Sequence, residues 1–385
     1  MPDMKRLSRQ RPIVLALSRI VPLIAPRRSE SRVCDDSNSL DAAAPLIVKW
    51  PDNVARPRVG LVQDTDAHPY WTKYRRFLQS NCFPFCLVDI HASSWIEMLG
   101  DVDMVVWRPS SQLDELEEAR KKVFFLQEFL GLPTYPTLRA VNLYEDKILQ
   151  SWALRHVGAQ MPMTVVSFSK ADALHGIADL GSEFVWKIAT GSSSFGVEGL
   201  SARRARAAIR RAFSARGRRT YWPFANQKGY VYAQMLERDL QTDMRIIVVG
   251  PLLSGYYRDA PAGDFRASGM GRVRKEALPS EALEEAWQIA QRLDVGAVAV
   301  DFLVDQDCRR RKAIEFSSFI EVLTSAQLQV DGRPGVYVRL SPGRFVFQPG
   351  DYWLQELALA EALGRACGLD TDELLFGSLG AEWKV

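Results

Sequence analysis

The sequence predicts an α/β layer near the N-terminus followed by a larger α+β body. Two observations lead to this prediction. Between about residues 56 and 140, short apolar runs alternate with stretches of helical spacing, which is the pattern of a parallel sheet. After residue 140, strand-like runs follow one another with fewer helices between them, as in antiparallel sheets. The 385 residues are 47% hydrophobic, which is ample for a buried core.

The predicted α/β layer spans residues 56 to 140. Its three apolar runs have the length of short strands and cover residues 58 to 63, 85 to 89 and 103 to 107. Residues 70 to 79 have helical spacing. A stronger helix is predicted from 115 to 130, because leucine and valine recur on one face and Gly131 and Pro133 follow it.

The predicted α+β body spans residues 141 to 330. Its strands are predicted at residues 184 to 188, 230 to 236, 244 to 249, 252 to 257, 297 to 304 and 311 to 316. Its helices are predicted at residues 146 to 156, 202 to 215 and 280 to 293. We expect the last segment, 331 to 385, to be strand and helix that pack on the body, with an amphipathic helix from 352 to 363.

Residues 1 to 55 carry Arg, Ser, Asp and Pro clusters without sustained periodicity, which predicts a poorly ordered extension. The apolar run from 12 to 24 resembles a signal peptide, but Arg19 and Pro22 interrupt it. Two interpretations stay open here, an extension or misassigned start, and a membrane-surface or secretory segment. No stretch of the chain reaches the roughly 20 apolar residues of a spanning helix, so no integral membrane span is expected.

The charge and cysteine content exclude several classes of protein. Basic and acidic residues nearly balance, 49 against 46, so the composition does not predict a nucleic-acid partner. The five cysteines are sparse and odd in number, which favours a reduced, cytoplasmic setting. The four histidines have no metal-ligand spacing, so a zinc hydrolase is not expected.

The first candidate site is Lys187 with the loop that follows it, residues 190 to 196 (Thr-Gly-Ser-Ser-Ser-Phe-Gly). A lysine at the end of a strand beside a small flexible loop can surround phosphate oxygens with one positive charge and several N–H and hydroxyl donors. The loop lacks the spacing of a P-loop. The alternative interpretation is that it is only a turn.

The second candidate site combines Asp301, in a strongly apolar strand, with Glu315 and Ser317, which lie on one face of the next strand. A hairpin between the strands would bring the two carboxylates together. Because buried carboxylates repel one another, a hard cation such as Mg²⁺ would stabilise the pair. Alternatively, Arg or Lys side chains neutralise each carboxylate, or one of them faces solvent.

A third group consists of Arg245, Arg258 and Arg266, which lie in the sequence between the first two sites. Arginine gives fixed, bidentate geometry to phosphate or carboxylate, and it can stabilise the charge that develops during acyl transfer. Surface ion pairing explains any one of them equally well. The arginine-rich stretch from 203 to 219 is interpreted as a solvated face, with contact to an anionic substrate or membrane surface as the alternative.

Arranged in order, these segments resemble the ATP-grasp superfamily, and within it the branch of the ribosomal-protein glutamate ligase and glutathione synthetase. The resemblance covers residues 140 to 325. It is carried by Asp146-Lys147, the strand and loop 185 to 197, the hinge strand 233 to 237, the Asp-x-Arg strand 243 to 250, the loop 263 to 268, Asp301, and Glu315-Phe-Ser317. Residues 66 to 74 and 144 to 147 also resemble ATP-grasp proteins associated with surface-polysaccharide genes.

The resemblance implies two lobes that clamp ATP, a small one from about 160 to 236 and a large one from 237 to 330. It implies nucleotide contacts from Lys147, Lys187, Ser192, Ser193, Ser194, Gly196, Gln234, Met235, Leu236, Asp243, Arg266 and Ser268. It implies that Mg²⁺, for which Mn²⁺ can substitute, is held by Asp301, Glu315 and Ser317. It assigns the catalytic stabilisation of charge to Arg258 and Arg266. Met235, Ser268 and Ser317 depart from the residues usual in the family.

The implied activity is a carboxylate–amine ligase that forms an acyl phosphate from ATP and releases ADP and phosphate. Its carboxylate and amine could be small molecules, peptides or saccharides, for example an amino acid joined to a sugar acid or a peptide. One alternative is a nucleotide-binding regulatory or scaffold protein without turnover, which the two serine replacements favour. Another is phosphoryl transfer to an acceptor that is not a carboxylate. A homodimer is compatible with the resemblance.

Overall fold

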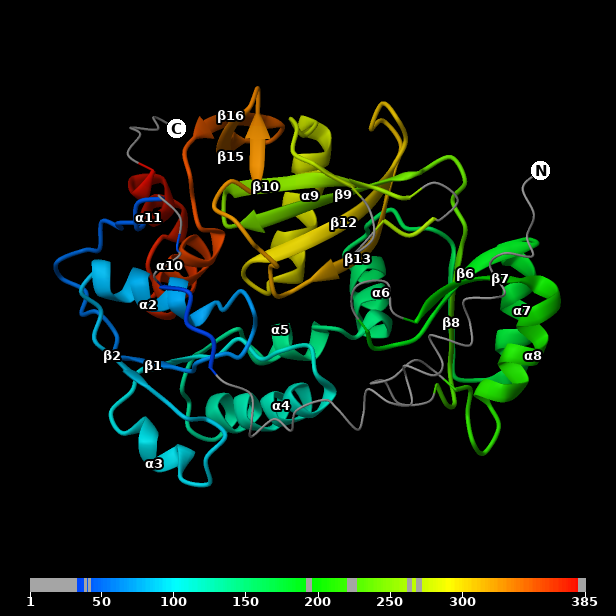
Figure 1. Cartoon of the computed structure of the whole chain (residues 1–385), viewed down its shortest axis with the longest axis horizontal. Coiled ribbons are helices and arrows are strands. Elements are labelled where there is room, and N and C mark those ends of the chain that lie inside the picture. The colour runs from blue at the N-terminus through cyan, green and yellow to red at the C-terminus, as the bar shows by residue number, and fades with distance from the viewer. Residues whose placement is uncertain are drawn as a thin grey trace.

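The computed structural model describes residues 33–37, 40, 43–191, 196–219, 227–261, 265–267 and 272–379. These residues form three sheets, which Figure 1 shows as a parallel layer, a large antiparallel sheet and a small antiparallel sheet. The described residues contain no helix that is long and apolar enough to cross a membrane. The predicted combination of an α/β layer with an α+β body is confirmed.

The N-terminal layer is a sheet in the order β2-β1-β3-β4, and all of its pairings are parallel. The strands are β1 (Val59–Leu61), β2 (Phe85–Leu87), β3 (Met104–Val106) and β4 (Thr134–Tyr135), of which β4 was not predicted. The helices are α2 (Trp71–Ser80), α3 (Trp95–Leu99), α4 (Leu113–Glu128) and α5 (Leu138–Leu143). The strands are short because turn residues bound each apolar run closely.

The small sheet has the order β5-β8-β6-β7 and is antiparallel throughout. Its strands are β5 (Thr164–Ser167), β6 (Glu183–Lys187), β7 (Val197–Ser201) and β8 (Val231–Met235). On one face, Phe184 and Trp186 pack against α7 (Lys170–Gly176) and α8 (Ala202–Ala212). Because successive strand residues alternate between faces, Val185 and Lys187 point the other way.

The large sheet has the order β13-β12-β9-β10-β15-β14, with β11 and β16 pairing onto β10 and β15. Its strands are β9 (Thr242–Val249), β10 (Leu252–Asp259), β11 (Arg272–Arg274), β12 (Val298–Val304), β13 (Arg311–Ser317), β14 (Leu328–Val330), β15 (Arg333–Ser341) and β16 (Arg344–Pro349). The segment from residue 331 was predicted to be strand and helix that pack on the large lobe. In the structure, β15 and β16 extend this sheet by backbone hydrogen bonding.

Two helices cover opposite faces of the large sheet. On one face, Met244, Ile246 and Val248 pack with α9 (Ser280–Leu293), whose apolar residues recur at helical spacing. On the other face, Ile247 and Val249 pack with α10 (Leu354–Ala366). The alternation of β9 therefore fixes which residues each helix covers.

Helix α10 was predicted to be amphipathic, and this prediction is wrong. Every residue from Leu354 to Glu361 is buried, because α10 lies between α2 of the N-terminal layer and β9 of the large sheet (Figure 1). The buried carboxylate of Glu356 accepts hydrogen bonds from Arg76 Nε at 2.6 Å and from the backbone N–H of Leu46 at 2.9 Å. Helix α11 (Thr371–Ser378) follows and packs on α10.

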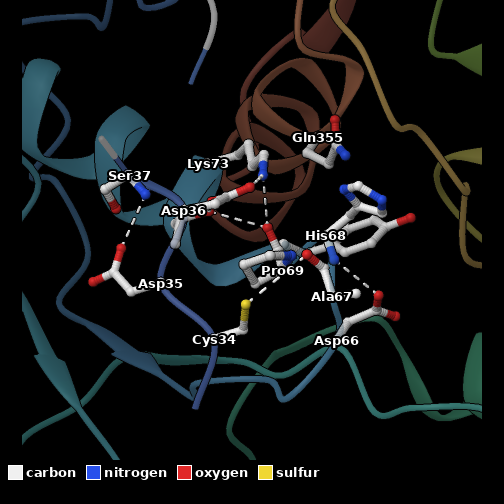
Figure 2. Close-up of polar contacts among 12 residues, drawn as sticks. Cys34, Asp35, Asp36, Ser37, Asp66, Ala67, His68, Pro69, Lys73 and Gln355 are labelled. Carbon is white, nitrogen blue, oxygen red and sulfur yellow. Dashed lines mark hydrogen bonds and ion pairs between the residues drawn. The ribbon is translucent and has the colours of Figure 1, made fainter. Parts of the chain in front are cut away.

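Of the extension expected to be poorly ordered up to residue 55, residues 1–32 lie outside the described residues, whereas residues 43–55 differ from this expectation. Leu46, Val48 and Trp50 are buried in the core with α2 and α10, and their spacing of two is that of an extended segment. Further upstream, Figure 2 shows Lys73 pointing to Asp36 and to the carbonyl oxygen of Pro69, at 2.5 and 3.0 Å. The Lys73 side chain is only 2% exposed, so this ion pair fastens residues 33–37 to α2.

The ion pair between Glu356 on α10 and Arg76 on α2 joins the C-terminal helix to the N-terminal layer, and its removal tests this connection. We expect Glu356→Gln to lower the free energy of unfolding by roughly 2 to 4 kcal/mol, because it leaves the Arg76 charge without its partner in a mostly buried position. Urea unfolding measures the change. The matched control is Glu117→Gln, which removes an exposed pair with Lys121 and should leave the unfolding midpoint unchanged. Equal effects of the two changes would contradict this account.

Candidate functional site

A cavity of about 550 Å³ lies between the free face of the small sheet and the adjoining end of the large sheet. This volume is within the range of small-molecule sites, roughly 300 to 1,000 Å³. The structure brings together these predicted residues in its lining: Lys147, Lys187, Gln234, Met235, Leu236, Asp243, Arg266, Asp301, Glu315 and Ser317. Gly196 ends the predicted loop beside it, between the lining residues Gly191 and Val197. Ser192, Ser193, Ser194 and Ser268 lie outside the described residues.

Two buried lysines occupy one end of the cavity. Lys187 ends β6 and is 5% exposed, and Lys147 begins α6 (Lys147–His156) and is 3% exposed. Asp146 caps α6 by accepting hydrogen bonds from the N–H groups of Ile148 and Leu149, at 3.1 and 3.0 Å. The cap fixes the backbone at the start of α6, and so the direction in which the Lys147 side chain extends from it.

The two lysines differ in their partners. Lys147 Nζ donates to the carbonyl oxygen of Gly191 and lies 3.3 Å from Glu315 Oε1. Lys187 has no acceptor for its ammonium group within the described part of the chain, where its Nζ lies 5.6 Å from the ring centre of Tyr232. Burial lowers the pKa of Lys187 from its ordinary value of 10.5 to about 8. A buried ammonium without an acceptor is arranged to receive an anion.

The wall formed by the large sheet carries a row of charges. Asp301 on β12 is paired in register with Glu315 on β13 and with Arg245 on β9, so the three side chains emerge on one face. Arg245 donates to both oxygens of Asp301 at 2.7 Å, from Nε and Nη2. Arg258 Nη2 lies 2.8 Å from Asp243 Oδ1 and 3.0 Å from Asp301 Oδ1.

These pairs set the charge states of the two aspartates. Burial acts to raise the pKa of Asp301, but the adjacent Arg245 and Arg258 outweigh it and lower the value to about 2. For Asp243, burial prevails over Arg258 and raises the pKa to about 6. Asp301 is therefore the firmly ionised member of the pair.

Arg258 was predicted to stabilise charge during catalysis. Its guanidinium joins Asp243 to Asp301, and it is not among the described residues that line the cavity, whereas Arg266 is. Arg258 pairs in register with Asp243 across β10 and β9, so the two side chains lie on the same face of the sheet.

The predicted metal ligands are partly engaged by the protein itself. Asp301 is held by two arginines, and Glu315 faces Lys147, as the alternative interpretation expected. Ser317 Oγ donates to the carbonyl oxygen of Phe319 at 2.5 Å. Among the described residues, no group of three His, Cys, Asp or Glu side chains could hold a metal ion.

Two carboxylates from neighbouring strands nevertheless fit one kind of magnesium site. Mg²⁺ is commonly held by one or two carboxylates together with phosphate oxygens and water, rather than by a cage of protein ligands. Asp301 and Glu315 both reach the cavity that holds the two lysines. The residues present therefore fit an ion shared with a bound polyphosphate, and they do not form a metal site by themselves.

The opposite end of the cavity has apolar walls. Val185, Leu303 and Ile314 line it, next to the end of β8. The N–H of Met235 donates to the carbonyl oxygen of Met163 at 2.8 Å, which fixes this end of the strand. Apolar walls at one end and cations at the other suit a ligand with a flat apolar ring and an anionic tail.

Sequence reasoning missed several residues that line this cavity, among them Glu145 and Glu321. Glu145 directly precedes Asp146 and Lys147, so its position beside a recognised motif was the signal that could have found it. Glu321 follows the Glu315 and Ser317 strand by one short loop, and nothing in its own sequence context distinguishes it from a surface residue.

Lys187 gives a prediction about pH. Below pH 8 the folded protein bears the cost of a buried charged lysine, and that cost disappears as the pH rises to 10.5, because the folded state then releases the proton. We expect Lys187→Met to raise the free energy of unfolding by roughly 2 to 3 kcal/mol at pH 7, with the gain shrinking toward pH 10.5. Urea unfolding at several pH values measures it, and a gain independent of pH would contradict the assignment.

Comparison with solved structures identifies the fold of this chain. No protein-family model and no curated protein matches the sequence. The structure is similar to D-alanine–D-alanine ligase from Bacillus anthracis, with a TM-score of 0.50 at 15% identity over 71% of this chain and 90% of that chain. It is similar to a RiPP-associated ATP-grasp ligase from Chryseobacterium gregarium in complex with ADP and a leader and core peptide, with a TM-score of 0.50 at 13% identity over 69% and 90%. The chain therefore has the ATP-grasp fold that its motifs predict.

Proposed function

We propose that this protein is an ADP-forming ligase that uses MgATP to join a carboxylate to an amine. One observation carries the proposal: two buried lysines and the carboxylates Asp301 and Glu315 line one cavity, whose other end is apolar. Lysines bind phosphates, and paired carboxylates hold the magnesium ion that accompanies them. The similar structures named above are ligases, which supports ATP-dependent formation of amide bonds as the general activity.

In this proposal each residue has a stated task. Lys147 and Lys187 bind the phosphates, and Val185, Leu303 and the hinge residues Gln234, Met235 and Leu236 enclose the base. Asp243 lies between the two ends, where the ribose belongs. Asp301 and Glu315 would hold the magnesium ion, and Arg266 would stabilise the charge that develops on the transferred group. Bound MgATP supplies the phosphoryl group that activates the carboxylate as an acyl phosphate.

Arg258 acts as a positioning residue in this scheme. Its guanidinium contacts both Asp243 and Asp301 and holds the two carboxylates in place. The glutamate-ligase branch, a homodimer and the identities of the two substrates stay predictions. The second candidate is a nucleotide-binding protein without turnover. It is favoured because the hydroxyl group of Ser317, a predicted metal ligand, already donates a hydrogen bond to the carbonyl oxygen of Phe319.

Hydroxylamine provides the test of turnover, because it is a small neutral nucleophile that captures acyl phosphates as hydroxamates. We expect wild-type protein with MgATP, pooled carboxylic acids and hydroxylamine to form hydroxamate together with equal amounts of ADP. Lys147→Met should abolish the product, because it removes a phosphate ligand. Tight nucleotide binding without hydroxamate from any acid would favour the second candidate, and no nucleotide binding would overturn both.

The magnesium assignment has a separate test. Glu315→Gln should raise the Mg²⁺ concentration needed for half-maximal binding of a fluorescent ATP analogue by at least roughly tenfold, because it removes one of two carboxylates. Without Mg²⁺ the variant should bind the analogue no more weakly than wild type, because Lys147 loses its competing partner. The control is Glu128→Gln on the exposed side of α4. An unchanged Mg²⁺ requirement would exclude Glu315 as a ligand.

A further inference from the structure

The cavity is also lined by two carboxylates that the proposed reaction has not used, Glu145 and Glu321. Glu145 lines the cavity, yet it is only 9% exposed. Its Oε2 atom is buried and has no hydrogen-bond partner among the described residues. A buried carboxylate oxygen without a hydrogen-bond donor destabilises the folded protein. Packing therefore does not explain why Glu145 is placed here.

The backbone holds Glu145 in this place. Its φ is +55°, a left-handed conformation that is uncommon for a residue other than glycine. On one side, Tyr144 is stacked on Phe319 with ring centres 4.1 Å apart, and on the other, Asp146 caps α6. The chain therefore keeps a strained residue and an unsatisfied oxygen at the same position, which is typical of functional sites.

Glu321 reaches the same cavity from a loop that is fastened on several sides. Ser318 Oγ donates to the carbonyl oxygen of Ala140 at 2.6 Å, and Tyr70 Oη donates to that of Ile320 at 2.5 Å. Gln355 Nε2 donates to the carbonyl oxygen of Val322 at 2.9 Å. The Glu321 side chain itself is 51% exposed, so a fixed loop presents an accessible carboxylate.

The cations near these two carboxylates are already engaged. The charged groups that face Glu145 are Lys147, Glu315, Glu321 and Arg245. Lys147 is held by Glu315 and Gly191, and Arg245 makes its short contacts to Asp301 and lies 3.8 Å from Glu321. Burial raises the pKa of Glu145 to about 7, with Glu315 and Glu321 adding to the effect and Lys147 opposing it. The two cations that face Glu145 therefore make their short contacts to other groups.

We propose that Glu145 and Glu321 form the subsite of the amine substrate, which binds there as a primary ammonium ion. The inference rests on the proposed ligase activity, because it places the nucleophile beside the phosphate lysines. On attack, the nitrogen–carbon bond forms and the bond from carbon to the phosphate oxygen breaks. Before this attack, Glu145 accepts one proton from the ammonium, which gives the nitrogen its lone pair. The second proton that the nitrogen loses leaves with the phosphate. Glu321 pairs with the ammonium at the rim.

Butylammonium is a suitable probe, because any site for a primary ammonium should accept it, and butanol is its neutral counterpart. We expect butylammonium chloride to raise the melting temperature of the wild-type protein, with or without MgAMPPNP, more than butanol and sodium chloride at equal concentrations. Glu145→Gln and Glu321→Gln should each weaken this binding by roughly tenfold. Glu128→Gln on α4 should bind the probe as wild type does.

The outcomes separate this inference from the proposed function. No effect of butylammonium on wild type, or the same effect on all four proteins, would overturn the amine subsite. A failure of MgAMPPNP to raise the melting temperature, with the butylammonium effect intact, would overturn the ligase and leave the cation site. A structural role for Glu145 would lower the melting temperature of Glu145→Gln, whereas loss of an unsatisfied buried carboxylate should not.

A kinetic comparison applies the same logic to turnover. Hydroxylamine is neutral at pH 7 and needs neither an anionic site nor a proton acceptor, whereas butylamine needs both. The ratio of hydroxamate formation to butylamide formation should therefore rise by roughly a hundredfold in Glu145→Gln. An unchanged ratio would overturn the role of Glu145 in receiving the amine.

Discussion

The site depends on one buried ionic network, in which Arg245 and Arg258 hold Asp243 and Asp301 on the face of the large sheet. Two positive and two negative charges balance within it, and each short contact lies between 2.7 and 3.0 Å. Removal of any one member would leave an uncompensated charge in a buried position, which costs several kcal/mol. The network therefore fixes the carboxylates before any ligand arrives, and the neighbouring lysines are positioned against a rigid wall.

That wall exists because one face of the large sheet is apolar at one end of β9 and charged at the other. Near α10 the face is apolar, with Ile247 and Val249 in the core, and two residues earlier on the same strand it carries Arg245. The strand period of two keeps these side chains on one face, while Met244, Ile246 and Val248 stay beneath α9. The hydrophobic core under α10 thus stops at Ile247, and the cavity begins at Arg245. The burial of α10 between the sheet and α2 also joins the N-terminal layer to the body.

The N-terminal layer contributes to the site through the loop that follows β13. Tyr70 from the layer and Gln355 from α10 bind the backbone of this loop, and Tyr144 stacks on its Phe319. Through these contacts, segments far apart in the sequence determine where Glu321 meets the cavity. The small sheet provides the other side, with Lys187 and Val185 on the face that its own helices leave free. Specificity for the second substrate would then come from the body and the layer together.

Local patterns in the sequence were sufficient for much of this. Strand and helix periodicity predicted β1, β2, β3, β6, β8, β9, β10, β12 and β13 within a few residues but missed the short strands β4, β5, β7 and β11. The order of short motifs pointed to the ATP-grasp fold. Lys147, Lys187, Asp301 and Glu315 were identifiable because each sits in a short segment whose chemistry is local. By contrast, α10 was misjudged because periodicity reports the polarity of a helix but not how many neighbours enclose it.

Only the tertiary structure decided which charged side chains pair with one another. The sequence determined that Arg245, Arg258, Asp243 and Asp301 lie on strands, but strand register decided that the two arginines meet the two aspartates. The sequence also contained Glu145 beside a recognised lysine, but whether any described residue donates a hydrogen bond to its Oε2 atom depends on everything packed around it. Charge state and hydrogen bonding at a buried position depend on residues distant in the chain, and only the folded protein brings these residues into contact.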